Sequence, residues 1–293
     1  MIAGLLAGKR ALVMGVANDH SLAWGIARRL AEAGAELAFT YQGEATRKRV
    51  APLAMSVGSD LVMPCDVEDI SSVDKVFETL AAQWGSLDIL VHAIAYSDRT
   101  ELKGRYAETT RANFSRTMVI SCFSFTEIAR RAATMMTDGG TMLTLTYGGS
   151  AKVMPNYNVM GVAKAALEAS VRYLAADFGP ANIRVNAISA GPVRTLAGAG
   201  VADARLMFNY QKRHAPLRRS VTIDEVGGAA LYLLSDLGSA VTGEIHYVDS
   251  GYNIMSMPNP EALQAVDAAE EAAERRAADS EAADMPMVLK AAE

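Results

Sequence analysis

The sequence predicts an α/β fold, with a single doubly wound parallel sheet of about seven strands flanked by helices. Seven short apolar runs are spaced along the chain and read ALVMGV, ELAFTY, DLVMPC, LDILVHAIA, TMLTLTY, IRVNAIS and EIHYVD. Segments with helical character alternate with these runs, and that alternation is typical of right-handed βαβ units. The chain has 293 residues, about half of them hydrophobic, which is enough to bury one large core.

Helices are expected between the apolar runs. SLAWGIARRLAEAG follows the first run and places Leu22, Ile26 and Leu30 on one stripe. It ends at Gly34, a residue suited to the C′ position of a helix. Further helices are expected at 70–84, 111–136, 157–178 and 224–234, the last with Thr222 as its N-cap. The less regular segment 198–219 fits either a lid over a substrate or an ordinary pair of surface helices.

The charge distribution separates a body from a tail. The chain has a net charge of -5, while residues 259–293 hold nine acids and three bases, so the body is close to neutral. Such a body does not favour nucleic-acid binding. We expect residues 1–257 to form one domain and the Ala/Glu-rich residues 258–293 to be a frayed helix or disordered.

The cysteines, the histidines and the N-terminal residues indicate the cellular compartment and whether a metal site is expected. Cys65 and Cys122 lie in apolar segments without a CxxC or Cys/His cluster, and the four histidines have no ligand spacing, so neither disulfides nor a metal site is expected. The apolar start precedes its positive charges, which is the wrong order for a secretory signal. No apolar run reaches the length of a membrane span. We expect a cytoplasmic protein that does not associate with membranes.

The stretch GVANDHSLAWG follows the first predicted strand and opens the first helix. Its backbone N–H groups and the helix N-terminus would face a bound pyrophosphate. Gly15 is expected to permit a tight exit from the strand, Ser21 to cap the helix or hold a phosphate, and Gly25 to allow close helix–sheet packing. The stretch does not match G-x-G-x-x-G, so by itself it is also compatible with a tight turn. Together with the strand pattern it predicts a Rossmann-like domain.

Two further strand ends favour NADH as the cofactor. Gln42 stands where such folds often have an acidic residue on the adenosine ribose, and it can still bond a ribose hydroxyl. No arginine stands at that strand end to meet a 2′-phosphate, although the basic residues 47–49 leave NADPH open. Asp66 could accept from the adenine amino group while Val67 packs against the ring. The alternative for Asp66 is a helix N-cap.

The stretch PNYNVMGVAK carries the main chemical signal. Tyr157 and Lys164 are seven positions apart, a rotation about 20° short of two full helical turns, so both side chains would share one helix face. Short-chain dehydrogenases usually have Tyr-x3-Lys, but Met160 occupies that tyrosine position here. A phenol one turn further away would contact an oxygen displaced from the carbon that receives hydride, as in a conjugated thioester. Tyr147, thirteen residues before Met160, stands where those enzymes have serine.

At these residues the chain closely resembles the enoyl-[acyl-carrier-protein] reductases of bacterial fatty-acid synthesis, a divergent branch of the short-chain dehydrogenases. The resemblance extends over about residues 5–257 and is carried by GVANDHSLAWGIA, LTLTYGGSAKVMPNYNVMGVAKAALEASVRYLA and RVNAISAGPVRTLA. It implies NADH-dependent reduction of the trans-2 double bond of enoyl thioesters held on acyl carrier protein, the last step of the elongation cycle. It also implies a homotetramer.

The resemblance implies roles for individual residues as well. Tyr157 would donate a hydrogen bond to the enolate oxygen, Lys164 would hold the nicotinamide ribose, and Tyr147 would line the acyl pocket with Ser97. Ile94 would lie beside the ribose, and residues 192–197 would cover the carboxamide and diphosphate. The candidate cofactor contacts are Gly15, Ser21, Leu22, Gln42, Asp66, Val67, Ile94, Lys164, Val193, Arg194, Thr195, Leu196 and Ala197.

Several alternatives stay open at this point. The chain could reduce other carbonyls or activated alkenes, although the missing Tyr-x3-Lys argues against ketones, or it could be a nucleotide-binding regulator without turnover. Either Tyr157 or water could deliver the proton. The basic residues Arg194, Arg205, Lys212, Arg213, Arg218 and Arg219 fit either docking of an acidic carrier protein or ordinary surface charge.

Overall fold

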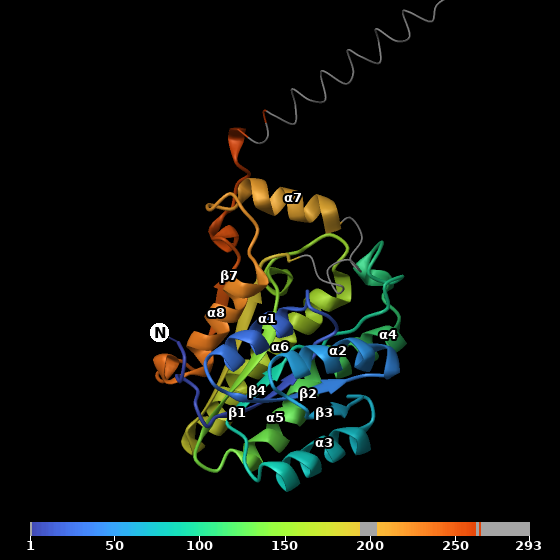
Figure 1. Ribbon diagram of the computed structural model, residues 1–293. Helices are drawn as coiled ribbons and strands as arrows, with labels where there is room; N and C mark the ends of the chain where they lie inside the picture. Colours follow the sequence, from blue (N-terminus) through green and yellow to red (C-terminus); the bar gives the residue numbers. More distant parts are fainter. Residues whose placement is uncertain (1, 194–203, 262–263, 265–293) are drawn as a thin grey trace, which may run out of the picture.

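The computed structural model describes residues 2–193, 204–261 and 264 of the chain. The seven expected strands form one parallel sheet in the order β3-β2-β1-β4-β5-β6-β7 (Figure 1). The strands are β1 Arg10–Met14, β2 Glu36–Tyr41, β3 Val62–Pro64, β4 Ile89–His92, β5 Gly140–Thr146, β6 Ile183–Ala190 and β7 Ile245–Val248. The strand order reverses between β1 and β4, and open parallel sheets bind ligands at such a switch point, at the carboxyl ends of the strands.

Helices cover both faces of the sheet. The described helices are α1 Leu22–Glu32, α2 Glu44–Ser56, α3 Ile70–Gln83, α4 Arg111–Met118, α5 Ser124–Met135, α6 Asn158–Phe178, α7 Ala204–His214 and α8 Ile223–Leu234. Successive strand residues point to opposite faces. In β1, Ala11 and Val13 join the core beneath α1, α2 and α8, whereas Leu12 and Met14 join the core beneath α3, α5 and α6. The predicted doubly wound architecture is confirmed.

Two helical regions differ from the sequence-based expectation. Helix α2 was not expected, because Pro52 lies inside it and only Val50 and Ala54 are buried, which leaves a weak amphipathic pattern. The expected helix 111–136 is divided into α4, a π-helical segment η2 at Val119–Phe123, and α5. π-helical segments arise from an extra residue per turn and occur often near functional sites.

The packing of α1 on α8 corrects the role expected for Gly25. A Cβ at Gly25 would lie 2.4 Å from the Ile223 carbonyl oxygen, and a Cβ at Gly227 would lie 2.5 Å from the Gly25 carbonyl oxygen. The prediction of helix–sheet packing was therefore wrong, since Gly25 permits close contact between two helices. Thr222 is the N-cap of α8 as predicted, in a capping box with Glu225.

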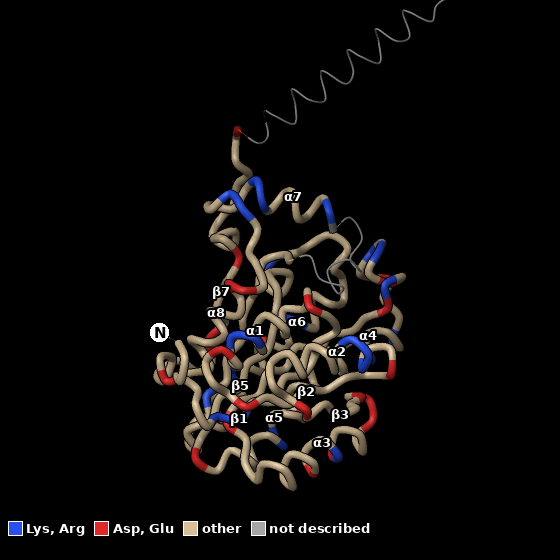
Figure 2. The backbone as a smooth tube through the Cα atoms, viewed as in Figure 1, with Lys and Arg blue, Asp and Glu red and all other residues tan. Residues whose placement is uncertain are grey.

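Helix α7 lies at one end of the molecule, far from α3 (Figure 1). It belongs to the irregular segment 198–219, of which residues 204–219 are described, and Figure 2 shows basic residues along the helix. Residues 194–203 lie outside the described part of the chain, as does the tail from 262 onward apart from Gln264.

Candidate functional site

The loop after β1 has the form expected of a phosphate-binding turn. Gly15 has φ +98°, and a Cβ there would lie 2.1 Å from the Ala93 carbonyl oxygen, so only glycine fits. Ser21 is the N-cap residue of α1, but its side chain makes no capping bond. Its hydroxyl instead accepts hydrogen bonds from the backbone N–H groups of Ala17 (3.0 Å) and Asn18 (3.1 Å). Ser21 therefore folds the loop back over the helix N-terminus that begins at Leu22.

The residues predicted for the adenosine end come together at the carboxyl ends of β2 and β3. The Gln42 side-chain amide donates a hydrogen bond to Asp66 Oδ2 at 2.9 Å. Val67, which follows Asp66 in the chain, is buried. The N-cap of α3 is Asp69, whose side chain accepts from the Ser71 N–H. The alternative assignment of Asp66 as a helix N-cap was therefore wrong. Asp66 belongs to a polar pair at the sheet edge.

Ile94 and Ser97 follow β4 and have different surroundings. Ile94 is half-buried and packs against the core beneath α3, α5 and α6. Ser97 is buried, and its Oγ accepts hydrogen bonds from the Thr117 hydroxyl at 2.9 Å and the Asn113 amide at 3.2 Å. The hydroxyl of Ser97 is thus engaged with α4, and a contact between Ser97 and substrate stays a prediction.

Tyr147 and Tyr157 meet although they come from different elements. Tyr147 follows β5, and Tyr157 is the N-cap residue of α6, one residue before the helix begins. Their ring centroids are 5.2 Å apart and the planes make an angle of 73°. Burial raises the pKa of both phenols. The side chains of Tyr147 and Tyr157 therefore both keep their protons at neutral pH. The Tyr147 hydroxyl is buried with no hydrogen-bond partner among the described residues.

The position of the displaced tyrosine is filled by an apolar side chain. Met160 is buried in a small cluster with Leu102 and Val159, and Tyr157 packs against that cluster. A Cβ at Gly149 would lie 2.5 Å from Tyr157 Cδ1. The Tyr157 ring therefore packs closely against both an apolar cluster and a glycine backbone.

Lys164 is buried, with only 6% of its surface exposed, and it lies on α6 next to the end of β5. Its Nζ donates a hydrogen bond to the Leu145 carbonyl oxygen at 2.8 Å. Burial lowers the pKa of Lys164 to about 8, against opposing effects of Cys122 and Glu168. A buried ammonium with donors to spare is suited to binding hydroxyl groups.

The structure adds Thr146 and Glu168, which the sequence reasoning missed. The Thr146 hydroxyl donates to Glu168 Oε1 at 2.6 Å. A signal was available, because Glu168 follows Lys164 by four residues on a predicted helix and such pairs lie on one face.

Val193 is the last described residue before the gap and packs against the core beneath α1 and α8. The predicted cofactor residues Arg194, Thr195, Leu196 and Ala197 lie outside the described residues. Within residues 2–193 and 204–261, no group of three His, Cys, Asp or Glu side chains is arranged to hold a metal ion. No helix in the same part of the chain is long and apolar enough to cross a membrane.

These features fit a bound dinucleotide. The tight turn at Gly15 leads the chain into the N-terminus of α1, where backbone N–H groups can face a diphosphate. Gln42 and Asp66 offer hydrogen-bond donors and acceptors at the adenosine end of the site. Lys164 offers an ammonium at the nicotinamide end.

Comparison with known proteins decides the family. Residues 15–253 match the family model described as "Enoyl-(Acyl carrier protein) reductase". The chain belongs to the enoyl-[acyl-carrier-protein] reductase family. Enoyl-[acyl-carrier-protein] reductase [NADH] 2 of Rhizobium meliloti is 72% identical over 265 residues, which cover 90% of this chain and 99% of that protein. Enoyl-[acyl-carrier-protein] reductase [NADH] 1 of the same organism is 60% identical over 254 residues, which cover 87% of this chain and 93% of that protein.

Solved structures of the reductase family agree. The crystal structure of FabI from Candidatus Liberibacter asiaticus superposes with a TM-score of 0.86 at 59% identity, covering 88% of this chain and 100% of that one. The Anaplasma phagocytophilum reductase, solved in complex with NAD, gives a TM-score of 0.85 at 57% identity, covering 88% of this chain and 98% of that one.

Proposed function

We propose that this protein reduces the trans-2 double bond of enoyl-acyl-carrier-protein thioesters with NADH, in the last step of the fatty-acid elongation cycle. The observation that carries the proposal is the site at the β5–α6 junction, where Tyr157 and Tyr147 adjoin and Lys164 is buried. The site belongs to a chain that is 72% identical to a relative named as an NADH-dependent reductase of this class.

NADH, when bound, would supply a hydride to the β-carbon of the substrate, and a proton delivered to the α-carbon by Tyr157 or by water would complete the reduction. Negative charge then develops on the thioester carbonyl oxygen, and the protonated Tyr157 phenol donates a hydrogen bond to it. One such donor is worth about 2.7–4 kcal/mol of transition-state stabilisation. Lys164 binds the nicotinamide ribose hydroxyls as an ammonium and adds positive potential at the site. Tyr147, whose hydroxyl has no partner among the described residues, lines the acyl pocket.

The remaining cofactor assignments form part of the same proposal. Gly15, Ser21 and Leu22 bind the diphosphate at the N-terminus of α1. Asp66 and Gln42 bind the adenosine, with Val67 against the adenine ring and Ile94 beside the ribose. Their support is the loop folded by Ser21 and the hydrogen bond between Gln42 and Asp66.

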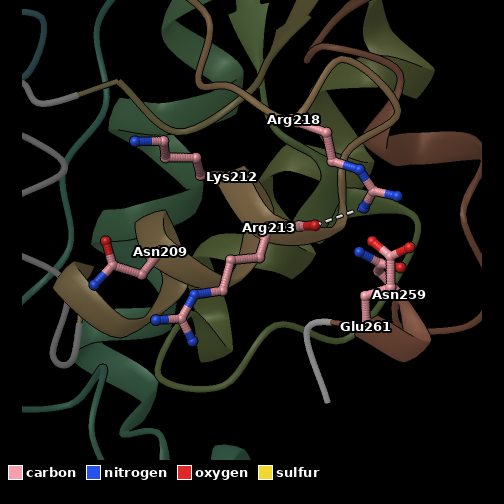
Figure 3. Close-up of a pocket in the computed structure, with 6 residues that line it drawn as sticks. All are labelled: Asn209, Lys212, Arg213, Arg218, Asn259 and Glu261. Atoms are coloured by element: carbon pink, nitrogen blue, oxygen red, sulfur yellow. Dashed lines mark hydrogen bonds between the residues drawn. The ribbon is translucent and has the colours of Figure 1, made fainter. Parts of the chain in front are cut away.

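An acidic carrier protein is the proposed partner, and the basic surface at α7 supports its docking there. A pocket of about 490 Å³ is lined by Asn209, Lys212, Arg213, Arg218, Asn259 and Glu261 (Figure 3). None of the ion pairs among the described residues involves its three cations. By contrast, Arg219 is paired with Glu225 at 2.6 Å, so this basic residue is less available to a partner.

The proposal extends to assembly, location and domain limits. Exposed apolar side chains on the adjoining elements α4, η2 and α6 support a homotetramer: Phe114, Val119, Phe123, Val162 and Tyr173. Cys65 and Cys122 are both free and buried, which supports a cytoplasmic location. The match of residues 15–253 to the family model supports a single domain of residues 1–257 followed by a separate tail.

A direct spectrophotometric assay tests the function. Purified protein is mixed with crotonyl-carrier protein and NADH, and the loss of NADH absorbance is followed, with NADPH and crotonyl-coenzyme A as comparisons. We expect rapid oxidation of NADH and a lower KM for the carrier-bound thioester. No oxidation of either nucleotide with any enoyl thioester, by a protein that still binds NADH, would overturn the proposal.

A further inference from the structure

The carboxyl end of β5 is fastened to α6 by two hydrogen bonds from adjacent residues. The Leu145 carbonyl oxygen accepts from Lys164 Nζ at 2.8 Å, and the Thr146 hydroxyl donates to Glu168 Oε1 at 2.6 Å. Thr146 is only 5% exposed, and the next residue is Tyr147. A hydrogen bond to a charged acceptor is roughly twice as strong as one between neutral groups. The carboxylate of Glu168 therefore fixes the strand end from which Tyr147 projects.

Glu168 also lies one helical turn beyond Lys164, on the same face of α6. The described titratable groups that act on Lys164 are Glu168 on its own helix, Cys122 on η2 and His92 on β4. Burial raises the pKa of Cys122, so this thiol stays neutral, and burial together with Lys164 lowers the pKa of His92 to about 3, so the imidazole stays neutral too. Among the described groups that face Lys164, only Glu168 supplies a negative charge.

The same carboxylate acts on two phenols. Glu168 contributes to the raised pKa of Tyr157 and of Tyr247 on β7, after burial in each case. Both phenols therefore remain neutral at the pH where the lysine is an ammonium. Burying an ammonium without a counter-charge is unfavourable, and the group then loses its proton.

We propose that Glu168 is a positioning residue for the reaction. Its carboxylate stabilises the ammonium form of Lys164, the form that binds the nicotinamide ribose, and its hydrogen bond with Thr146 fixes the end of β5. The inference rests on the function proposed above, because it gives Lys164 the same role. It assigns to Glu168 no contact with substrate or cofactor.

Two nearly isosteric variants separate the charge from the hydrogen bond. Glu168→Gln removes the charge but keeps an oxygen that accepts from the Thr146 hydroxyl. Thr146→Val removes the hydroxyl but keeps the charge. Lys164 and Glu168 are not among the ion pairs of the described residues, so Glu168 acts on the pKa of Lys164 through its charge rather than through direct contact.

The readout is NADH affinity measured by fluorescence titration across pH. In Glu168→Gln the pH at which affinity declines should move down by about one unit. In Thr146→Val that midpoint should stay at the wild-type value while kcat falls, because Tyr147 is less well held. Glu168→Asp keeps the charge and should also keep the midpoint. Thermal unfolding of each variant reports whether the fold is intact.

The result that would overturn the inference is a pH profile of Glu168→Gln that superposes on the wild-type profile, or a midpoint in Glu168→Asp displaced as far as in Glu168→Gln. Lys164→Met separates this failure from failure of the proposed function. If Lys164→Met binds NADH as tightly as wild type, the role given to the lysine is wrong and the inference falls with it. If Lys164→Met binds weakly at every pH but Glu168→Gln is unaltered, the role of the lysine stands and only that of Glu168 is wrong.

Discussion

The edge of one tyrosine ring meets the other, with the centroids of Tyr147 and Tyr157 5.2 Å apart. The contact joins the end of β5 to the start of α6, so both phenols reach one site although ten positions separate them in the chain. Burial is the main cause of the raised pKa of each phenol, and Tyr147 contributes further to that of Tyr157. Two neutral hydroxyls therefore occupy a site where one tyrosine is the proposed donor to the enolate.

The first prediction concerns that donor. Tyr157→Phe should lower kcat by about 10²–10³-fold, because one oxyanion donor is lost. Affinity for NADH should stay close to wild type, since the variant keeps the ring packed against Gly149 and the Met160 cluster. Steady-state kinetics with crotonyl-coenzyme A and NADH titrations measure the two quantities.

Tyr147→Phe is the matched control for this prediction. It removes the other hydroxyl and preserves the ring contact, and it should reduce kcat less than Tyr157→Phe. Equal losses would mean that the two phenols share the role, and a larger loss in Tyr147→Phe would reassign the donor.

A second prediction follows from the buried lysine. Burial lowers the pKa of Lys164 to about 8, so the ammonium is lost as pH rises through that value and NADH affinity should decline. The folded state should not weaken over the same range. The unfolded chain holds this proton up to the ordinary value of 10.5, so it binds more protons between about 8 and 10.5, and the lysine's contribution to stability rises with pH there.

Affinity and unfolding are measured on the same samples at several pH values. Lys164→Met should bind NADH weakly at neutral pH and should lack the wild-type decline. A decline that persists in Lys164→Met would assign the titration to another group.

A third prediction tests the contact between α1 and α8. Gly227→Ala should destabilise the protein by about 1–3 kcal/mol, because the added Cβ would lie 2.5 Å from the Gly25 carbonyl oxygen. Gly228→Ala, on the exposed side of the same helix, meets nothing within 4 Å and should stabilise the protein by up to about 1 kcal/mol. Denaturant unfolding of both variants gives the comparison, and equal effects would contradict the packing argument.

A fourth prediction concerns the choice of nucleotide. NADPH should bind more weakly than NADH, because a 2′-phosphate near Gln42 would approach the Asp66 carboxylate bonded to it. Gln42→Glu should lower NADPH affinity further and leave NADH affinity little changed. Competitive titration of both nucleotides measures the ratio. A wild-type protein that uses both equally well would point to the basic residues 47–49 as a phosphate site.

The sequence was most informative where periodicity and turn chemistry agree. All seven strands, the helix that starts at Leu22 and the N-cap at Thr222 were predicted, because apolar runs and caps are local signals. Helix α2 was missed, because Pro52 and a weakly apolar face give it little amphipathic periodicity. The helix is instead stabilised by its packing against β2 and β3. The π-helical turn in η2 was missed too, because the residues on either side have ordinary helical periodicity.

The sequence alone determined the chemistry available to the site, because the spacing of Tyr157 and Lys164 and the glycine turn after the first strand are properties of the linear chain. Only the tertiary structure decided the environment of these groups. The ring contact between Tyr147 and Tyr157, the packing of Leu102 in the cluster beside Tyr157, and the link from Thr146 to Glu168 each join different elements of the fold. Protonation depends on burial and neighbouring charge, and both are set when the sheet and its helices pack together.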